Sequence, residues 1–203
     1  MAVLTESYVR NYAKSYINTK QFSSHATRDS ICKSALIESS ENFSGLETYD
    51  IFLSHSFLDK ELILGLKLLL EKYNFSVYVD WTEDPQLDRK NVTRKNVEII
   101  KERMKTSTSL LYVVTDNSAN SKWMPWELGF MDGYTGKVAI LPVTNDNEGF
   151  KEHEYLNIYP YIDEAGFSKI PGQTLWVNDP TNANKYSKLE EWISSGELEL
   201  HIT

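Results

Sequence analysis

The chain has 203 residues, a formal net charge of −8 and ordinary apolar and charged fractions, which fits one globular core with a small addition. The acidic balance argues against a sequence-independent grip on nucleic acid, which needs a basic surface. Cys32 is the only cysteine, no stretch is long and apolar enough to cross a membrane, and residues 1–10 lack the apolar segment of a signal peptide, so we expect a cytoplasmic protein with no intrachain disulfide and no membrane partner.

Residues 1–48 are predicted to form a helical extension, and residues 49–203 the main domain. A first helix is predicted over residues 6–18, because apolar and aromatic side chains recur there at helical spacing: Tyr8, Val9, Tyr12, Ala13, Tyr16 and Ile17. A second, weaker helix is predicted after Thr27. Such a pair is too small to fold alone, so we expect it to pack on the main domain or on a second subunit.

From residue 49 onward, short apolar runs alternate with helical patterns. The runs are too short for helices and rich in β-branched or aromatic residues, which predicts strands at 49–54, 75–79, 109–115, 137–143 and 175–177. This alternation indicates an α/β fold with a five-stranded parallel sheet and helices on both faces. We expect the flavodoxin-like strand order 2-1-3-4-5. Residues 144–171 are expected to be irregular, and a helix over residues 186–194 to close the chain.

A proline and a glutamate mark the helix that follows strand 109–115. Pro125 has no N–H to donate, so it fits the first turn of a helix and poorly anywhere later. Glu127 then lies in or near that turn, above the carboxyl end of the strand, where open α/β sheets bind ligands. If the helix has begun by Trp123, this side chain shares a face with Glu127, an arrangement that suits a flat heterocycle joined to a sugar. The structural alternative makes Trp123 a core residue and Glu127 a first-turn acid favoured by the helix dipole.

The expected strand order brings a second segment to the same place. Strands 49–54 and 109–115 are neighbours in that order, and the helices that follow them leave on opposite faces of the sheet. The crevice therefore opens between Ser54-His55-Ser56 and residues 116–127. We expect His55 at the pocket rim or as a capping residue. Ser56 is expected to cap the next helix, with Asp59 completing a capping box.

Two common kinds of site are not predicted. The sequence has neither G-x-G-x-x-G nor G-x-x-x-x-G-K-[ST], the usual phosphate-binding loops. The histidines show no metal-ligand spacing beyond the weak signal of His153 between two glutamates, so we predict no metal site.

A set of motifs recurs in one order along the main domain: Tyr-Asp-Ile-Phe-Leu-Ser-His-Ser from residue 49, Val-Tyr-Val-Asp-Trp from 77, Ser-Leu-Leu-Tyr-Val-Val-Thr from 109, and Ser-x-Trp-x-x-x-Glu-Leu-Gly from 121. On these motifs, residues 49–194 resemble a TIR domain. The Trp-x-x-x-Glu spacing is similar to the NAD-cleaving branch of that family. The resemblance implies that Glu127 is catalytic. It also implies a group of substrate-binding residues: Trp123, Ser54, His55, Ser56, Asp80 and Trp81.

The same resemblance implies partners. NAD+ would be the substrate, with no further cofactor, and TIR domains commonly associate through the loop that matches residues 80–93. The N-terminal stripe of Tyr8, Val9, Tyr12, Tyr16 and Ile17 is also more aromatic than a small covering segment needs. We therefore expect the active species to be a homo-oligomer in which loop 80–93 of one subunit helps to shape a neighbour's pocket. Stand-alone bacterial relatives make a nucleotide signal for an effector in anti-phage defence of the Thoeris type. The chain departs from the family in two places: loop 80–93 has no glycine, and His55 and Ser56 stand where relatives often have a basic residue. Trp81 has a packing role beneath this loop as its alternative.

Cleavage of the nicotinamide–ribose bond builds positive charge on the ribose, as glycoside cleavage does. Nicotinamide is a good leaving group, so one ionised carboxylate suffices to favour the cationic transition state. Attack by water gives ADP-ribose, and attack by a group of the same molecule gives a cyclic product; both remain open at this point. Two alternatives to this NAD-consuming enzyme are a non-catalytic TIR interaction scaffold and an enzyme that resembles nucleoside deoxyribosyltransferases, which also use a glutamate.

Overall fold

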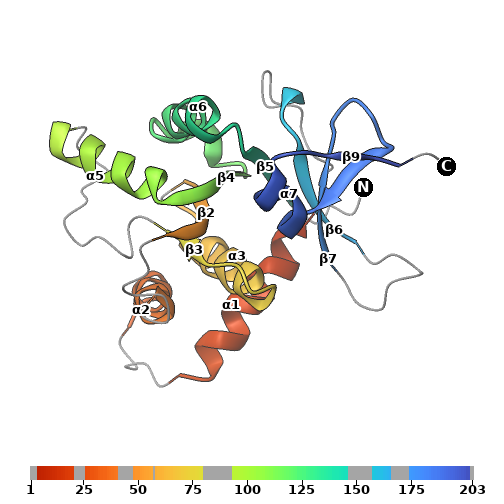
Figure 1. Cartoon of the computed structure of the whole chain (residues 1–203). Helices are drawn as coiled ribbons and strands as arrows, with labels where there is room; N and C mark the ends of the chain where they lie inside the picture. The colour runs from red at the N-terminus through yellow and green to blue at the C-terminus, as the bar shows by residue number, and fades with distance from the viewer. Residues whose placement is uncertain are drawn as a thin grey trace.

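The computed structural model describes residues 4–20, 26–40, 48–56, 58–79, 93–145, 157–165 and 174–201 (Figure 1). Its strands form one sheet in the order β3-β2-β4-β5-β6-β7-β8-β9, and the short strand β1 (Leu4–Thr5) pairs with β5. The parallel end of the sheet contains β2 (Tyr49–Ser54), β3 (Val77–Tyr78), β4 (Ser107–Val114) and β5 (Val138–Thr144). Within the described ranges, no helix is both long and apolar enough to cross a membrane.

Parallel pairing follows the predicted order across these four strands. β2 lies between β3 and β4, with Ile51 opposite Val77 and Leu53 opposite Leu111. β5 then pairs with β4 on its far side. The α/β class and the 2-1-3-4 part of the order are therefore confirmed.

Side chains along the central strands alternate between two hydrophobic cores, one on each face of the sheet. In β2, Ile51 and Leu53 enter the first core, whereas Phe52 enters the second. Helix α3 (Lys60–Lys72) contributes to the first core. Helices α5 (Arg94–Lys105) and α6 (Met124–Thr135) contribute to the second. The helices that follow β2 and β4 thus cover opposite faces, and this places the predicted crevice at the carboxyl edge between those two strands.

The far end of the sheet differs from the prediction. The fifth parallel place is occupied by β6 (Tyr161–Ala165), which pairs with β5 inside a segment expected to be irregular. The run predicted as the fifth parallel strand forms β7 (Thr174–Asn178), which is antiparallel to β6. A parallel connection needs a dozen or more residues, and residues 166–173 are too few.

Antiparallel strands complete this end of the sheet. They are β8 (Lys185–Lys188) and β9 (Glu199–Leu200). The closing helix α7 (Leu189–Ser195) begins later than predicted, because Tyr186 belongs to β8, where it lies opposite Asn178 of β7.

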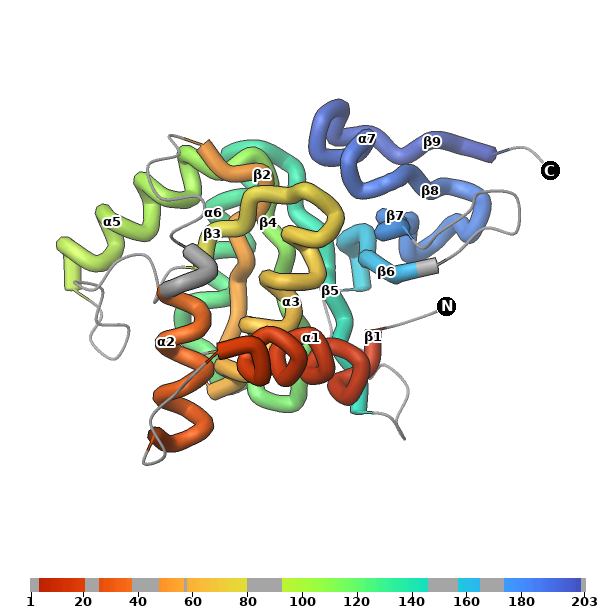
Figure 2. Tube along the Cα trace, turned by 90° about the horizontal axis from the view of Figure 1, so that it is seen from below, coloured from red at the N-terminus to blue at the C-terminus, as the bar shows by residue number. Residues whose placement is uncertain are grey.

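The N-terminal helices α1 (Glu6–Asn18) and α2 (Arg28–Ser40) pack against α3, so that α1 crosses it on the outer side (Figures 1 and 2). Val9 and Ala13 are fully buried in the first core, as the amphipathic pattern predicts. The approach is close at Gly65, where an ideal Cβ would lie 2.2 Å from the carbonyl oxygen of Val9. Only glycine permits that contact. The packing is on the main domain of the same chain, and the domain boundary after residue 48 stays a prediction.

Candidate active site

The first turn of α6 carries Glu127 at the carboxyl edge of the sheet, where the crevice is predicted. Pro125 lies in that turn, as predicted, and the backbone N–H of Glu127 donates to the carbonyl oxygen of Trp123 at 2.9 Å. Glu127 is the acid of the first turn and is fully buried. A buried carboxylate is costly unless it is hydrogen-bonded, and the donor comes from the neighbouring strand.

Ser54 ends β2 and points toward α6. Its hydroxyl Oγ donates to Glu127 Oε2 at 2.6 Å, and Ser54 is also fully buried. The bond joins residues that are 73 positions apart in the chain. The topology thus brings the two predicted residues into direct contact, and this short hydrogen bond fixes the orientation of the carboxyl group.

Trp123 lies at the N-cap position of α6, and its side chain belongs to the second hydrophobic core. It is 7% exposed and makes an edge-to-face contact with Trp126, with ring centroids 5.7 Å apart. Most of its surface is therefore used in packing. The structural alternative for Trp123 fits this burial, and a role in the substrate pocket stays a prediction.

His55 and Ser56 continue the chain beyond β2. His55 is fully buried, and its expected place at the substrate pocket stays a prediction. Its Nδ1 lies 2.7 Å from the carbonyl oxygen of Leu53. Because a carbonyl oxygen only accepts, we assign the proton to Nδ1, which leaves Nε2 with a lone pair in the neutral ring. Ser56 is nearly buried, and its role in binding stays a prediction.

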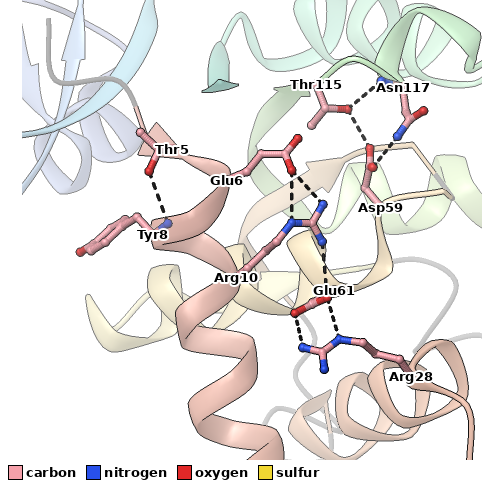
Figure 3. A network of polar contacts seen from close by, with 9 residues as sticks. All are labelled: Thr5, Glu6, Tyr8, Arg10, Arg28, Asp59, Glu61, Thr115 and Asn117. Carbon is pink, nitrogen blue, oxygen red and sulfur yellow. Dashed lines mark hydrogen bonds and ion pairs between the residues drawn. The ribbon is translucent and has the colours of Figure 1, made fainter. Parts of the chain in front are cut away.

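The predicted capping box at the start of α3 is wrong. Asp59, rather than Ser56, is the N-cap residue, and its side chain makes no capping hydrogen bond. Its oxygens instead accept from the loop after β4: Oδ2 from Thr115 Oγ1 at 2.7 Å and Oδ1 from Asn117 Nδ2 at 2.6 Å (Figure 3). Of these three residues, only Asn117 belongs to a segment that was predicted to line the crevice.

Two predicted substrate-binding residues, Asp80 and Trp81, lie outside the described residues, as does nearly all of loop 80–93. Their roles stay predictions. In the ranges that are described, no group of three or more His, Cys, Asp or Glu side chains is arranged to hold a metal ion.

The site therefore has two sides. The first wall comprises residues 54–56, 58 and 59, after β2, and the second wall comprises residues 115–127, after β4. The Ser54–Glu127 bond and the Asp59 bonds to Thr115 and Asn117 connect them. A buried, oriented carboxylate at the carboxyl edge of a parallel sheet is suited to stabilise positive charge on a bound sugar.

No protein-family model matches the chain. A curated relative from Bacillus cereus (strain MSX-D12), named "Probable 3' cyclic ADP-D-ribose synthase ThsB'", is 38% identical over 195 residues, which are 95% of this chain and 98% of that protein. A second, "Putative cyclic ADP-D-ribose synthase TIR2" from Cytobacillus dafuensis, is 31% identical over 111 residues, which are 54% of this chain and 29% of that protein. The similarity to the first spans nearly the full length of both proteins. The chain belongs to the TIR protein family, among the relatives named as cyclic ADP-D-ribose synthases.

Proposed function

We propose that this protein consumes NAD+ by cleaving the bond between nicotinamide and ribose, and that it releases nicotinamide and a cyclic ADP-ribose-type product. The observation that carries the proposal is the buried carboxylate of Glu127, held by Ser54 at the ligand-binding edge of the sheet. The names of the two relatives support the same reaction class.

Glu127 is the proposed catalytic residue. As the C–N bond breaks, its electron pair moves to the nicotinamide nitrogen, and positive charge develops on the ribose. A carboxylate fixed beside the ribose stabilises that charge more in the transition state than in the bound substrate, which is the condition for a faster reaction. The Ser54 hydroxyl, already committed to Glu127 Oε2, holds the carboxylate in place without taking a proton from it.

The proposed nucleophile is a hydroxyl of the same NAD+ molecule, which gives the cyclic product. Its oxygen bonds to the anomeric carbon and its proton is released. Attack by water at the same carbon gives ADP-ribose instead. The cyclic outcome is favoured because the B. cereus relative is named as a 3' cyclic ADP-D-ribose synthase. We propose that this product serves as a signal to a partner effector in anti-phage defence.

One incubation tests the reaction. Purified protein is mixed with NAD+ or with a set of deoxynucleosides plus free base, and the products are identified by mass spectrometry. Nicotinamide with a cyclic ADP-ribose isomer is the expected result. Base exchange between deoxynucleosides would identify a deoxyribosyltransferase, and unchanged substrates in all mixtures would identify a non-catalytic scaffold.

A homo-oligomeric active species remains part of the proposal. The N-terminal stripe no longer argues for it, because Val9 and Ala13 are buried against the same chain. The argument that remains is the family resemblance of loop 80–93. Association makes specific activity rise with protein concentration, so nicotinamide release is measured across a dilution series beside light scattering. A monomer with constant specific activity at every concentration would exclude an oligomer.

A further inference from the structure

Asp59 connects the two walls of the site by a second route, separate from the Ser54–Glu127 bond. It is 6% exposed, and each of its carboxylate oxygens has one donor on the second wall, Thr115 or Asn117. Figure 3 shows the carboxylate at the start of α3, turned toward the loop after β4. Hydrogen bonds to a buried charged group are among the stronger ones in proteins, so this contact resists separation of the walls.

The usual reason for an aspartate at this position does not apply. An N-cap aspartate normally accepts from the free N–H groups of the first helical turn, and Asp59 makes no such bond. Ser56 does not replace it, because the N–H that donates to Ser56 Oγ, at 3.4 Å, is that of Leu58, which precedes the helix. The carboxylate of the N-cap residue is instead used across the crevice.

The donors of this contact belong to a turn that is itself well held. The N–H of Asn117 donates to Thr115 Oγ1 at 3.2 Å, and Ser118 Oγ donates to the carbonyl oxygen of Thr115 at 2.7 Å. Ser118 is buried and begins the 3-10 helix η2 (Ser118–Asn120), which leads to α6. Because the turn is held internally, fixing Thr115 and Asn117 fixes the start of the segment that carries Glu127.

We propose that Asp59 is a positioning residue for the proposed NAD+ cleavage. It fixes the separation of the first and second walls, so that the nicotinamide ribose is held against Glu127. The inference rests on the proposed function and adds a residue that touches neither the substrate nor Glu127 and acts through Thr115 and Asn117. A site whose walls are held apart at the right distance binds its substrate at a lower entropic cost, so loss of this spacing should weaken the binding of NAD+, which makes the role measurable.

The experiment measures KM and kcat for nicotinamide release, and the Kd for NAD+ in a Glu127→Gln background, where the substrate stays intact. Asp59→Ala is expected to raise KM and Kd about tenfold, the effect of a site whose walls are no longer held at the right distance. Asp59→Asn is expected to stay within about threefold of wild type. The introduced amide still accepts from Thr115 through its oxygen, and the amide of Asn117 can turn to accept from its NH2 group.

Asp50→Ala is the matched control. Asp50 lies near the start of β2, whereas the site lies at the end of that strand. Its Oδ2 accepts from the N–H and the hydroxyl of Ser76 at 2.7 Å each. Its loss removes a comparable pair of hydrogen bonds far from the carboxyl edge. We expect a lower melting temperature for this variant with KM unchanged, which separates positioning from general stability.

Unchanged KM and Kd in Asp59→Ala would overturn the inference, whatever its melting temperature. If Asp59→Ala does not fold, Thr115→Val and Asn117→Ala each remove one of the two bonds; raised KM in both supports positioning, and wild-type KM in both overturns it. Nicotinamide release by Glu127→Gln would refute the proposed catalytic role of Glu127. If Glu127→Gln is inactive, and adding Asp59→Ala to it leaves the Kd for NAD+ unchanged, the positioning role of Asp59 alone would be refuted.

Discussion

The first turn of α3 makes polar contacts in two directions, and the two sets differ in burial (Figure 3). Toward the site, Asp59 is nearly buried and bonds to the second wall. Toward the N-terminal helices, Glu61 accepts from Arg28 at 2.6 Å and lies 3.5 Å from Arg10, and the side chains of these arginines are 57% and 30% exposed. The buried set specifies geometry, whereas the Glu61 pairs, whose arginines reach solvent, are expected to contribute only about 0–1 kcal/mol each.

The N-terminal helices are therefore held mainly by packing rather than by charge. Val9 and Ala13 are completely buried, and the close contact of Val9 with Gly65 leaves no space for a side chain on α3. The salt bridges of Glu61, and that of Lys60 with Asp29, lie along the rim of this contact. Hydrogen bonds matter most at the site and apolar surface matters most at the extension. Four changes test that contrast.

The largest expected effect is on the buried polar side. Glu127→Gln keeps the size and the backbone of the residue but removes the charge, so it should lower nicotinamide release by at least about 100-fold, the scale of a lost electrostatic contact in the transition state. Ser54 can still donate to the amide oxygen, so the melting temperature should change little. Nicotinamide release is followed by chromatography, and a folded variant with near wild-type turnover would remove Glu127 from the mechanism.

The second change separates packing from binding at Trp123. Trp123→Ala removes a side chain that is 7% exposed and packs in the second core, so we expect the free energy of unfolding to fall by roughly 3–5 kcal/mol. Denaturant unfolding is measured beside the activity assay. A variant with unchanged stability and a raised KM would show that Trp123 serves the substrate rather than the core.

The third change addresses the contact between α1 and α3. Gly65→Ala places a methyl group against the backbone of α1, and the expected loss of stability is about 1–3 kcal/mol or more. Gly133→Ala in α6 is the matched control, because nothing lies within 4 Å of its added Cβ; alanine should stabilise that exposed helix position by up to about 1 kcal/mol. Equal unfolding midpoints for the two variants would contradict the close packing of α1 on α3.

The smallest expected effect concerns the exposed charges. The hydrogen bond from Arg28 holds the pKa of Glu61 below its ordinary value of 4.5. A lowered pKa in the folded state means that ionised Glu61 stabilises the fold above pH 4.5, and that this contribution is lost as the pH falls through the folded-state pKa. Glu61→Gln should therefore be less stable than wild type at neutral pH by no more than about 1 kcal/mol.

This difference between wild type and Glu61→Gln should close in acid, because a protonated glutamate resembles glutamine. The free energy of unfolding of both proteins is measured from neutral pH to well below the ordinary glutamate pKa of 4.5. A difference that stays constant over that range would show that the ion pairs with Arg10 and Arg28 do not contribute through charge.

Local pattern was sufficient to predict the parallel half of the fold and the place of Glu127. Short apolar runs rich in β-branched and aromatic residues defined β2, β4 and β5, and their alternation with helices predicted a parallel sheet in the flavodoxin-like order. Pro125 restricted the helix start to its immediate neighbourhood, which put Glu127 in the first turn. The Ser54–Glu127 contact then follows from strand order, even though the two residues are far apart in the chain.

Tertiary contacts decided the features that the pattern did not predict. β6 contains Asp163 and Glu164, a composition depleted in strands, and both are buried because Asn178 donates to Asp163 at 3.1 Å and Tyr73 donates to Glu164 at 2.6 Å. Those partners come from elements that only the folded chain brings together.

The same reason explains Asp59 and the N-terminal helices. Residues 56 to 59 have the local pattern of a capping box. The side chain of Asp59 bonds instead to Thr115 and Asn117, which are 56 and 58 positions away in the chain. An amphipathic stripe specifies that α1 buries one face. The surface against which it packs, α3, is specified by the absence of a side chain at Gly65. Sequence alone determined the order of the parallel strands β3, β2, β4 and β5 and the carboxylate at their edge. The hydrogen-bond partners of the buried polar groups, and the surface of α3 on which the N-terminal helices pack, depended on the tertiary structure. The atoms that make these contacts are distant from one another in sequence.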